Sequence, residues 1–203
     1  LAIKEFRQVC QLIPENIEAR MALALVYQAK GDVNNALSHY NEILAIDSEL
    51  LYIHGLIGDV YREQGKFDQA KIHYLKARED EELVVVHLYG LGVLAENAGD
   101  FTGAIDYYRE VLATGPDHVG AALRLTELLR SNGELDAAME VLIEANRYNP
   151  REAGLHYLWG LLYMEKGSLH EAVHEFERVL QLDKDHPLAK GRLQDATELL
   201  NLA

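Results

Sequence analysis

The chain is organised by one ten-residue stretch, GDVNNALSHY at residues 31–40, which returns four times along its 203 residues. The later copies are GKFDQAKIHY at 65–74, GDFTGAIDYY at 99–108, GELDAAMEVL at 133–142 and GSLHEAVHEF at 167–176, each 34 residues after the one before. Every copy starts with glycine and has an apolar residue two positions later, an alanine five positions later and a large side chain nine positions later. A fixed period of this length indicates one structural unit repeated along the chain.

The residues of the repeated stretch have identifiable roles in helix formation and packing. Glycine ends a helix because it adopts positive φ without strain, and Pro14, Pro116 and Pro150 stop helices because proline has no N–H. Between these residues the apolar side chains recur at i, i+3, i+4 and i+7, which is typical of amphipathic helices, and no stretch alternates as a strand would. Each period therefore predicts two helices, and small residues such as Gly160 facing bulky ones such as Phe176 let the two pack closely.

This pattern resembles the tetratricopeptide repeat family, a 34-residue helix-turn-helix with small and large residues at these offsets. The resemblance covers essentially the whole chain, and Thr126, at an otherwise small position, is a local departure. It implies an all-α fold, a right-handed α-solenoid of antiparallel helix pairs with about twelve helices.

The period also predicts where the repeats begin and end. Residues 1–16 match only the second helix of a repeat, which predicts a truncated repeat in a longer protein, and 187–203 match a first helix whose outer packing positions are polar, which predicts a C-terminal capping helix. The complete repeats are predicted at 17–50, 51–84, 85–118, 119–152 and 153–186.

Composition excludes several classes of function. With 33 acidic and 19 basic residues the formal net charge is −14, which would repel a nucleic acid. The longest uncharged apolar run, residues 83–95, is too short for the roughly 20 residues of a membrane-spanning helix, so we expect no direct membrane insertion. The single cysteine, Cys10, cannot form an internal disulfide and leaves the cellular compartment undetermined.

The resemblance implies that the first helix of each hairpin lines a concave groove for a protein or peptide partner. The first-helix residues not needed for internal packing are largely apolar, so we expect an apolar peptide or amphipathic helix, with cationic residues suited to the acidic chain. No cofactor and no catalysis are expected. The predicted groove residues are Met21, Leu25, Tyr52, Leu56, Asp59, Arg62, Val86, Tyr89, Val93, Glu96, Asn97, Leu123, Arg124, Glu127, Arg130, Tyr157, Leu158, Leu161 and Met164.

Alternatives remain open at this point. Stacking of successive repeats would bury part of the groove, and the chain could serve as the recognition arm of a larger enzyme or of a secretion or assembly machine. Self-association through the N-terminal half-repeat is a further alternative. A known subclass of the family clamps the C-terminal carboxylates of chaperones with lysine and asparagine, but Met21, Leu25, Gly55 and Asp59 stand at those positions, which argues against that function.

One motif resembles a catalytic site. His170-Glu171-Ala172-Val173-His174 satisfies H-E-x-x-H, which on a helix would present two zinc ligands and a general base. The register places Ala172 and Phe176 toward the core, so both histidines are expected on the outward face without a third ligand or a cleft. We therefore predict no metal site and no protease activity.

Overall fold

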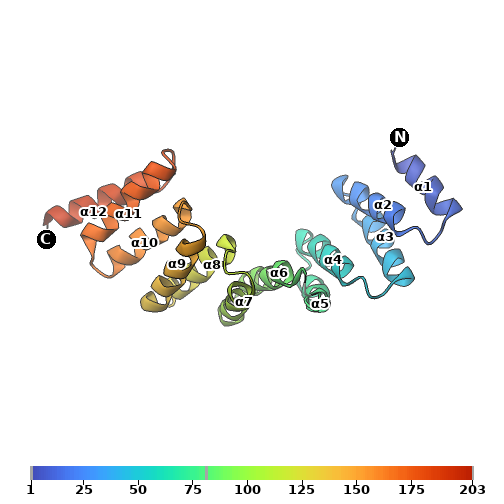
Figure 1. The fold of residues 1–203 in the computed structure, drawn as a ribbon, viewed down its shortest axis with the longest axis horizontal. Helices are drawn as coiled ribbons and strands as arrows, with labels where there is room; N and C mark the ends of the chain where they lie inside the picture. The colour runs from blue at the N-terminus through green and yellow to red at the C-terminus, as the bar shows by residue number, and fades with distance from the viewer. Residues whose placement is uncertain (1, 81, 203) are drawn as a thin grey trace. The chain divides into compact units, whose positions relative to one another are not determined.

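The computed structural model describes residues 2–80 and 82–202, which form twelve α-helices and no strand. Residues 1, 81 and 203, which fall in the predicted blocks 1–16, 51–84 and 187–203, lie outside the described residues. Helices adjacent in sequence form antiparallel pairs (Figure 1), which confirms the all-α prediction. The helices are α1 (Ala2–Leu12), α2 (Ile17–Ala29), α3 (Val33–Ile46), α4 (Leu51–Glu63), α5 (Phe67–Ala77), α6 (Val84–Asn97), α7 (Phe101–Thr114), α8 (Val119–Ser131), α9 (Leu135–Tyr148), α10 (Ala153–Glu165), α11 (Leu169–Leu182) and α12 (Ala189–Leu202).

The chain divides into two compact units. The N-terminal unit comprises residues 1–94 and the C-terminal unit residues 95–203, with the boundary inside α6. Each unit has a core of its own: Tyr40 and Ile57 are buried in the first, and Tyr108, Leu142 and Phe176 in the second. No helix among the described residues is long and apolar enough to cross a membrane.

The glycines that start each copy of the repeated stretch make the turns between paired helices. All five have positive φ, between 70° and 79°, and no other residue in the described part of the chain does. At the first turn, the Gly31 N–H donates to the Gln28 carbonyl at 2.9 Å and the Asp32 N–H to the Tyr27 carbonyl at 2.9 Å. These bonds satisfy carbonyls left over at the end of α2, and the Asp32 carboxylate then caps α3 by accepting from the Asn35 N–H.

Other glycines let helices approach one another. A Cβ at Gly58 would lie 2.8 Å from the Tyr74 ring, and a Cβ at Gly90 would lie 3.0 Å from the same ring. The ring of Tyr74 therefore packs between α4 and α6, where only the absence of a side chain leaves room. In the C-terminal unit Gly160 of α10 receives the ring of Phe176 of α11 in the same way.

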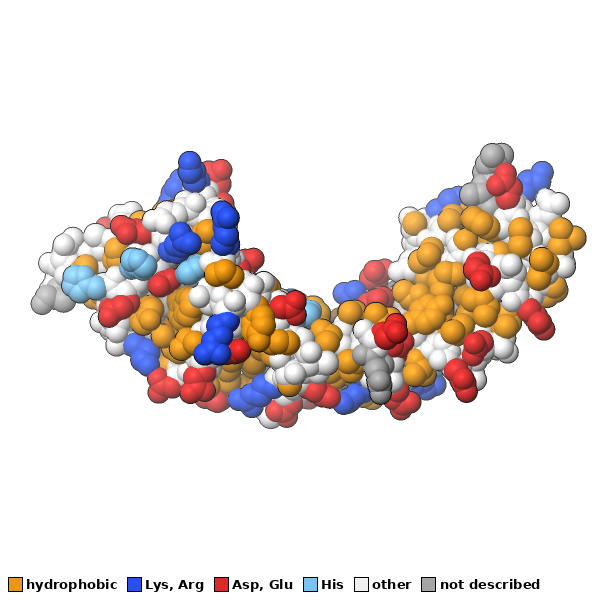
Figure 2. Space-filling model, viewed as in Figure 1, with side chains coloured by type: hydrophobic (Ala, Val, Ile, Leu, Met, Phe, Trp, Pro, Cys, Tyr) orange, Lys and Arg blue, Asp and Glu red, His pale blue; other side chains and the backbone are white. Residues whose placement is uncertain are grey.

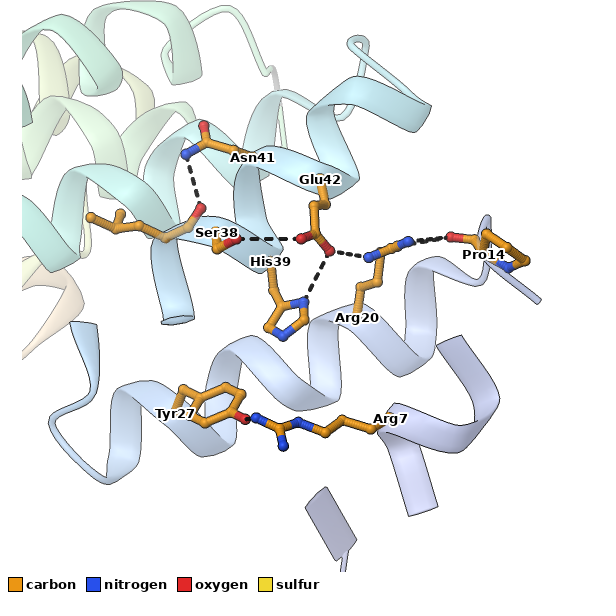
Figure 3. Close-up of polar contacts among 9 residues, drawn as sticks. Arg7, Pro14, Arg20, Tyr27, Ser38, His39, Asn41 and Glu42 are labelled. Atoms are coloured by element: carbon orange, nitrogen blue, oxygen red, sulfur yellow. Dashed lines mark hydrogen bonds and ion pairs between the residues drawn. The ribbon is translucent and has the colours of Figure 1, made fainter. Parts of the chain in front are cut away.

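Arg20 joins three elements at the N-terminal end of the chain (Figure 3). Its Nε donates to the Pro14 carbonyl at 2.9 Å, and its Nη1 pairs with Glu42 of α3, whose carboxylate also contacts His39 Nδ1 at 3.1 Å. The Arg20 side chain is 16% exposed, so these bonds form in a partly desolvated setting. They fix the turn that joins α1 and α2 against α3.

Candidate functional site

The predicted groove residues divide by exposure. In the N-terminal unit Leu25 and Val86 are exposed, at 47% and 58%, whereas Met21, Tyr52 and Leu56 are half-buried against the core. The face in Figure 2 shows hydrophobic side chains gathered over this unit. An apolar first-helix surface is thus present there, although part of it is already used in packing.

In the C-terminal unit packing also uses part of the predicted surface. Leu158 is 8% exposed and offers little surface to a partner. Tyr157, Leu161 and Met164 pack against the core that contains Phe176, and the Tyr157 ring lies 5.9 Å from the Phe176 ring and 4.9 Å from the ring of His186. Stacking of α10 on its neighbours therefore takes up apolar surface that the sequence suggested for a ligand.

Predicted residues from two first helices meet in one pocket of the N-terminal unit. The pocket lies between α4 and α6 and has a volume of about 210 Å³. Five of its seven lining residues belong to the predicted groove, and the other two, Tyr74 and Gly90, are not among the predicted residues. The lining residues are Asp59, Arg62, Tyr74, Val86, Tyr89, Gly90 and Val93.

The polar end of this pocket is held by a buried phenol. The Tyr74 hydroxyl donates to Asp59 Oδ1 at 2.5 Å and accepts from Arg62 Nε at 3.1 Å, while Arg62 Nη2 lies 3.3 Å from Asp59 Oδ1. Burial raises the pKa of Tyr74, and the hydrogen bond to Asp59 raises it further, so the hydroxyl remains a neutral donor. The carboxylate and the guanidinium are thus fixed to a ring that is itself held between two helices.

The same relation recurs at the 34-residue period. Tyr40 donates to Gln28, Arg62 donates to Tyr74, and Tyr108 donates to Glu96, each pair twelve residues apart. Polar residues at 28, 62 and 96 therefore meet a tyrosine on the second helix of their hairpin. The twelve-residue spacing between a polar residue and a tyrosine is visible in the sequence, and it could have been used to predict that these first-helix residues have a partner inside the protein.

Ion pairs occupy the first-helix face of the C-terminal unit. Arg124 Nη1 of α8 lies 2.6 Å from Glu96 Oε2. Arg130 pairs with Glu127 at 2.5 Å and also with Glu165 of α10. The charged residues that were predicted to contact a ligand therefore form ion pairs within the protein, either within one first helix or with the next first helix.

The histidines take up several settings. His170 and His174 of the H-E-x-x-H motif are exposed, and no group of three or more metal-ligating side chains occurs within residues 2–80 and 82–202. His156 is buried and contacts Glu175 Oε2 through Nδ1 at 2.7 Å. His73 contacts His54 Nδ1 to Nδ1 at 3.0 Å, so one ring donates and the other accepts, and burial lowers the pKa of His73 to about 4.

A second hollow lies on the second-helix side of the C-terminal unit, where no site was expected from the sequence. It has a volume of about 380 Å³ and a mainly apolar lining between α7 and α9. Its lining residues are Arg109, Leu112, Ala113, Pro116, Leu125, Glu140, Val141, Glu144 and Ala145.

Comparison with known families agrees with the fold and the period. Four models of the tetratricopeptide repeat match the chain, at residues 16–82, 56–119, 97–160 and 153–186. The chain belongs to the tetratricopeptide repeat family. Tetratricopeptide repeats generally mediate protein–protein interactions, and none of the four matching models describes a catalytic domain.

Individual relatives are distant. Lipopolysaccharide assembly protein B of Escherichia coli K12 is 23% identical over 181 residues, covering 83% of this chain and 46% of that protein. The chain also spans only 23% of the tetratricopeptide repeat-containing protein trd-1 of Caenorhabditis elegans, so it corresponds to less than half the length of either relative.

Solved structures share the fold of this tetratricopeptide repeat protein. YrrB, described as a TPR protein with an unusual peptide-binding site, superimposes with a TM-score of 0.69 at 20% identity, over 92% of this chain and 96% of that one. PilF of Pseudomonas aeruginosa superimposes with a TM-score of 0.73 at 20% identity, over 95% of this chain and 86% of that one.

Proposed function

We propose that this tetratricopeptide repeat protein binds a peptide or an amphipathic helix of a partner protein along its first helices, with the main contacts in the N-terminal unit. The observation that carries the proposal is the pocket between α4 and α6, in which five of the predicted groove residues lie together. The exposed side chains of Val86 and Leu25, which also lie on first helices, add to the apolar surface of the N-terminal unit. The repeat limits given above, from 17–50 to 153–186, are part of this proposal.

A role within a larger assembly is a second candidate. Its support is that the chain spans less than half of relatives such as lipopolysaccharide assembly protein B, a protein named for an assembly process. In that case the repeats would be the recognition segment of a longer polypeptide, and the local role of the first helices would be unchanged.

Site-specific photo-crosslinking tests the proposed surface. A benzophenone amino acid at Val86 of α6 should capture a partner protein in extracts of the native source, whereas the same probe at Ile72 of α5 should not capture that partner. The two positions are matched, at 58% and 56% exposed, and they belong to a first and a second helix of the same unit. Equal capture from both positions, or capture from Ile72 alone, would contradict the proposal.

Substitution at the same pair of positions provides a quantitative measurement. Val86→Glu should weaken binding of the captured partner about tenfold, because a charge would be buried against an apolar ligand, and Ile72→Glu should leave the affinity unchanged. Tyr157 is less suitable for this purpose because its ring also packs on Phe176 and His186.

A further inference from the structure

We propose that the pocket between α4 and α6 receives the side-chain carboxamide of a glutamine on the bound partner. The inference rests on the proposed function and specifies the chemistry that this site selects. It follows from the hydrogen-bonding atoms that the pocket leaves unused, from its charge balance and from its size.

The polar end of the pocket has one oxygen atom and one nitrogen atom without a hydrogen bond in the described part of the chain. Asp59 uses Oδ1 for both Tyr74 and Arg62, and Oδ2 has no partner among residues 2–80 and 82–202. Arg62 uses Nε and Nη2, and its Nη1 has no partner in the same described part of the chain. Both side chains line the pocket and are 38% exposed, so a ligand can reach them.

A carboxamide matches this pair of atoms. Its NH₂ group can donate to the Asp59 carboxylate while its oxygen accepts from the Arg62 guanidinium. A carboxylate would meet Asp59 with like charge, and an ammonium group would meet Arg62 in the same way. Because the Asp59–Arg62 pair is neutral as a whole, a neutral dipolar group gains both hydrogen bonds without the cost of burying a net charge.

The remaining walls fit the stem of such a side chain. Val86, Tyr89 and Val93 supply apolar surface, and the methylene groups of glutamine can pack on it. The volume of about 210 Å³ is below the range of about 300–1,000 Å³ that is usual for small-molecule sites, which favours one inserted side chain over a cofactor.

The pocket is also organised before any ligand arrives. The ring of Tyr74 packs against Gly58 on one helix and Gly90 on the next, and its hydroxyl orients both Asp59 and Arg62. Side chains fixed in this way lose little conformational freedom on binding, which favours selectivity for one hydrogen-bonding pattern.

Titration of the full chain with short peptides tests the inference. The peptides are acetylated and amidated at their ends, are otherwise alanine, and differ only in a central glutamine, asparagine, glutamate, lysine or methionine. Backbone NMR shifts of Tyr89, Gly90 and Val93 report occupancy of the pocket. The glutamine peptide should bind about tenfold more tightly than the glutamate, lysine and methionine peptides, because none of these three side chains can make both hydrogen bonds without burying a charge.

A matched pair of variants connects the preference to the pocket. Arg62→Met should abolish the preference for glutamine over methionine, since it keeps the side-chain length and removes the donor. Arg147→Met, at an arginine that is 68% exposed in the C-terminal unit, should keep it. Circular dichroism establishes that both variants are folded before the affinities are compared.

The possible outcomes separate this inference from the proposed function. Equal binding of all five peptides with shifts in the pocket would overturn the carboxamide inference, because the main chain alone would then be recognised, but would leave the proposed surface intact. Tighter binding of the glutamate, lysine, asparagine or methionine peptide would also overturn it. Shifts confined to second-helix residues would count against both proposals, and no shift with any peptide would overturn the inference and leave the binding surface to be decided by crosslinking.

Discussion

Replacing Gly160 by alanine should destabilise the C-terminal unit through one steric conflict. The new Cβ would lie 2.5 Å from Cε1 and 2.7 Å from Cζ of Phe176, a ring with no exposed surface. Overpacking of this kind costs about 1–3 kcal/mol. Alanine also gains about 0.5–1 kcal/mol over glycine in helix propensity, so we expect a net loss of about 1–2 kcal/mol.

Gly191→Ala is the matched control for this substitution. Gly191 lies in α12 of the same unit, and a Cβ there would meet nothing within 4 Å. This variant should therefore be more stable than the parent by about 0.5–1 kcal/mol from helix propensity alone. Because both substitutions gain a similar propensity term, the difference between the two variants isolates the conflict with Phe176.

Urea unfolding followed by tryptophan fluorescence measures this difference. Trp159 is the only tryptophan in the chain and precedes Gly160, so its signal reports the C-terminal unit even when the two units unfold separately. With an m-value of about 2 kcal/mol/M, the midpoints of the two variants should differ by about 1 M. Equal midpoints would show that the Phe176 ring moves aside without cost, and they would refute the argument that position 160 requires a residue without a side chain.

Three further substitutions test separate features of the structure. Thr126 is fully buried and its hydroxyl has no partner among the described residues, so Thr126→Val, which keeps the shape, should raise the free energy of unfolding by about 1 kcal/mol in the same urea assay. Burial, together with the charges of His54 and Lys76, lowers the pKa of His73 from 6.5 to about 4. Between these two pH values the unfolded chain binds a proton at His73 that the folded chain excludes. The free energy of unfolding should therefore fall as the pH drops from about 6.5 to about 4. His73→Gln should flatten that pH dependence, and an unchanged slope would contradict the assignment. Arg20→Ala removes hydrogen bonds to the turn between α1 and α2 and to α3. It should lower the free energy of unfolding by about 1–2 kcal/mol, measured by far-UV circular dichroism in urea. An unchanged unfolding midpoint would show that water replaces those bonds at no cost.

The fold could be predicted from sequence because its determinants are local and repeat. Gly31 and the glycines in register with it take positive φ, a backbone requirement that a single residue type meets. The small first-helix residue and the large second-helix residue that contact one another belong to the same hairpin. The contact of Gly160 with Phe176 is therefore specified by a fixed separation along the chain. Long-range information was not needed for either feature.

The surface left for a ligand was harder to predict because it depends on how successive hairpins stack. Leu158 occupies the first-helix position equivalent to that of Arg124, which is exposed, yet Leu158 is only 8% exposed in α10. Arg124 and Glu96 are separated by 28 residues and belong to different helices, and their ion pair follows from the stacking angle rather than from the periodicity of either helix. A residue's place in the repeat therefore predicts the helix face it occupies but does not predict which neighbour covers it.

The second-helix column is the position that holds Tyr74 in one repeat and Leu142 in another, and its residue decides how the polar first-helix residue twelve positions earlier is held. Where that column holds tyrosine, as at Tyr74, its hydroxyl engages polar first-helix groups and fixes them at the polar end of a pocket. Where it holds Leu142, no hydroxyl is available, and Arg130 pairs instead with Glu127 and Glu165 on the first helices themselves. Arg130 thereby becomes part of a chain of ion pairs that a ligand would have to break, whereas Arg62 keeps a donor free for one. In the proposed binding mode, selectivity for a partner should therefore be set in the N-terminal unit, where Arg62 is hydrogen-bonded to Tyr74 and keeps a free donor. The number of charges on the first-helix face should matter less.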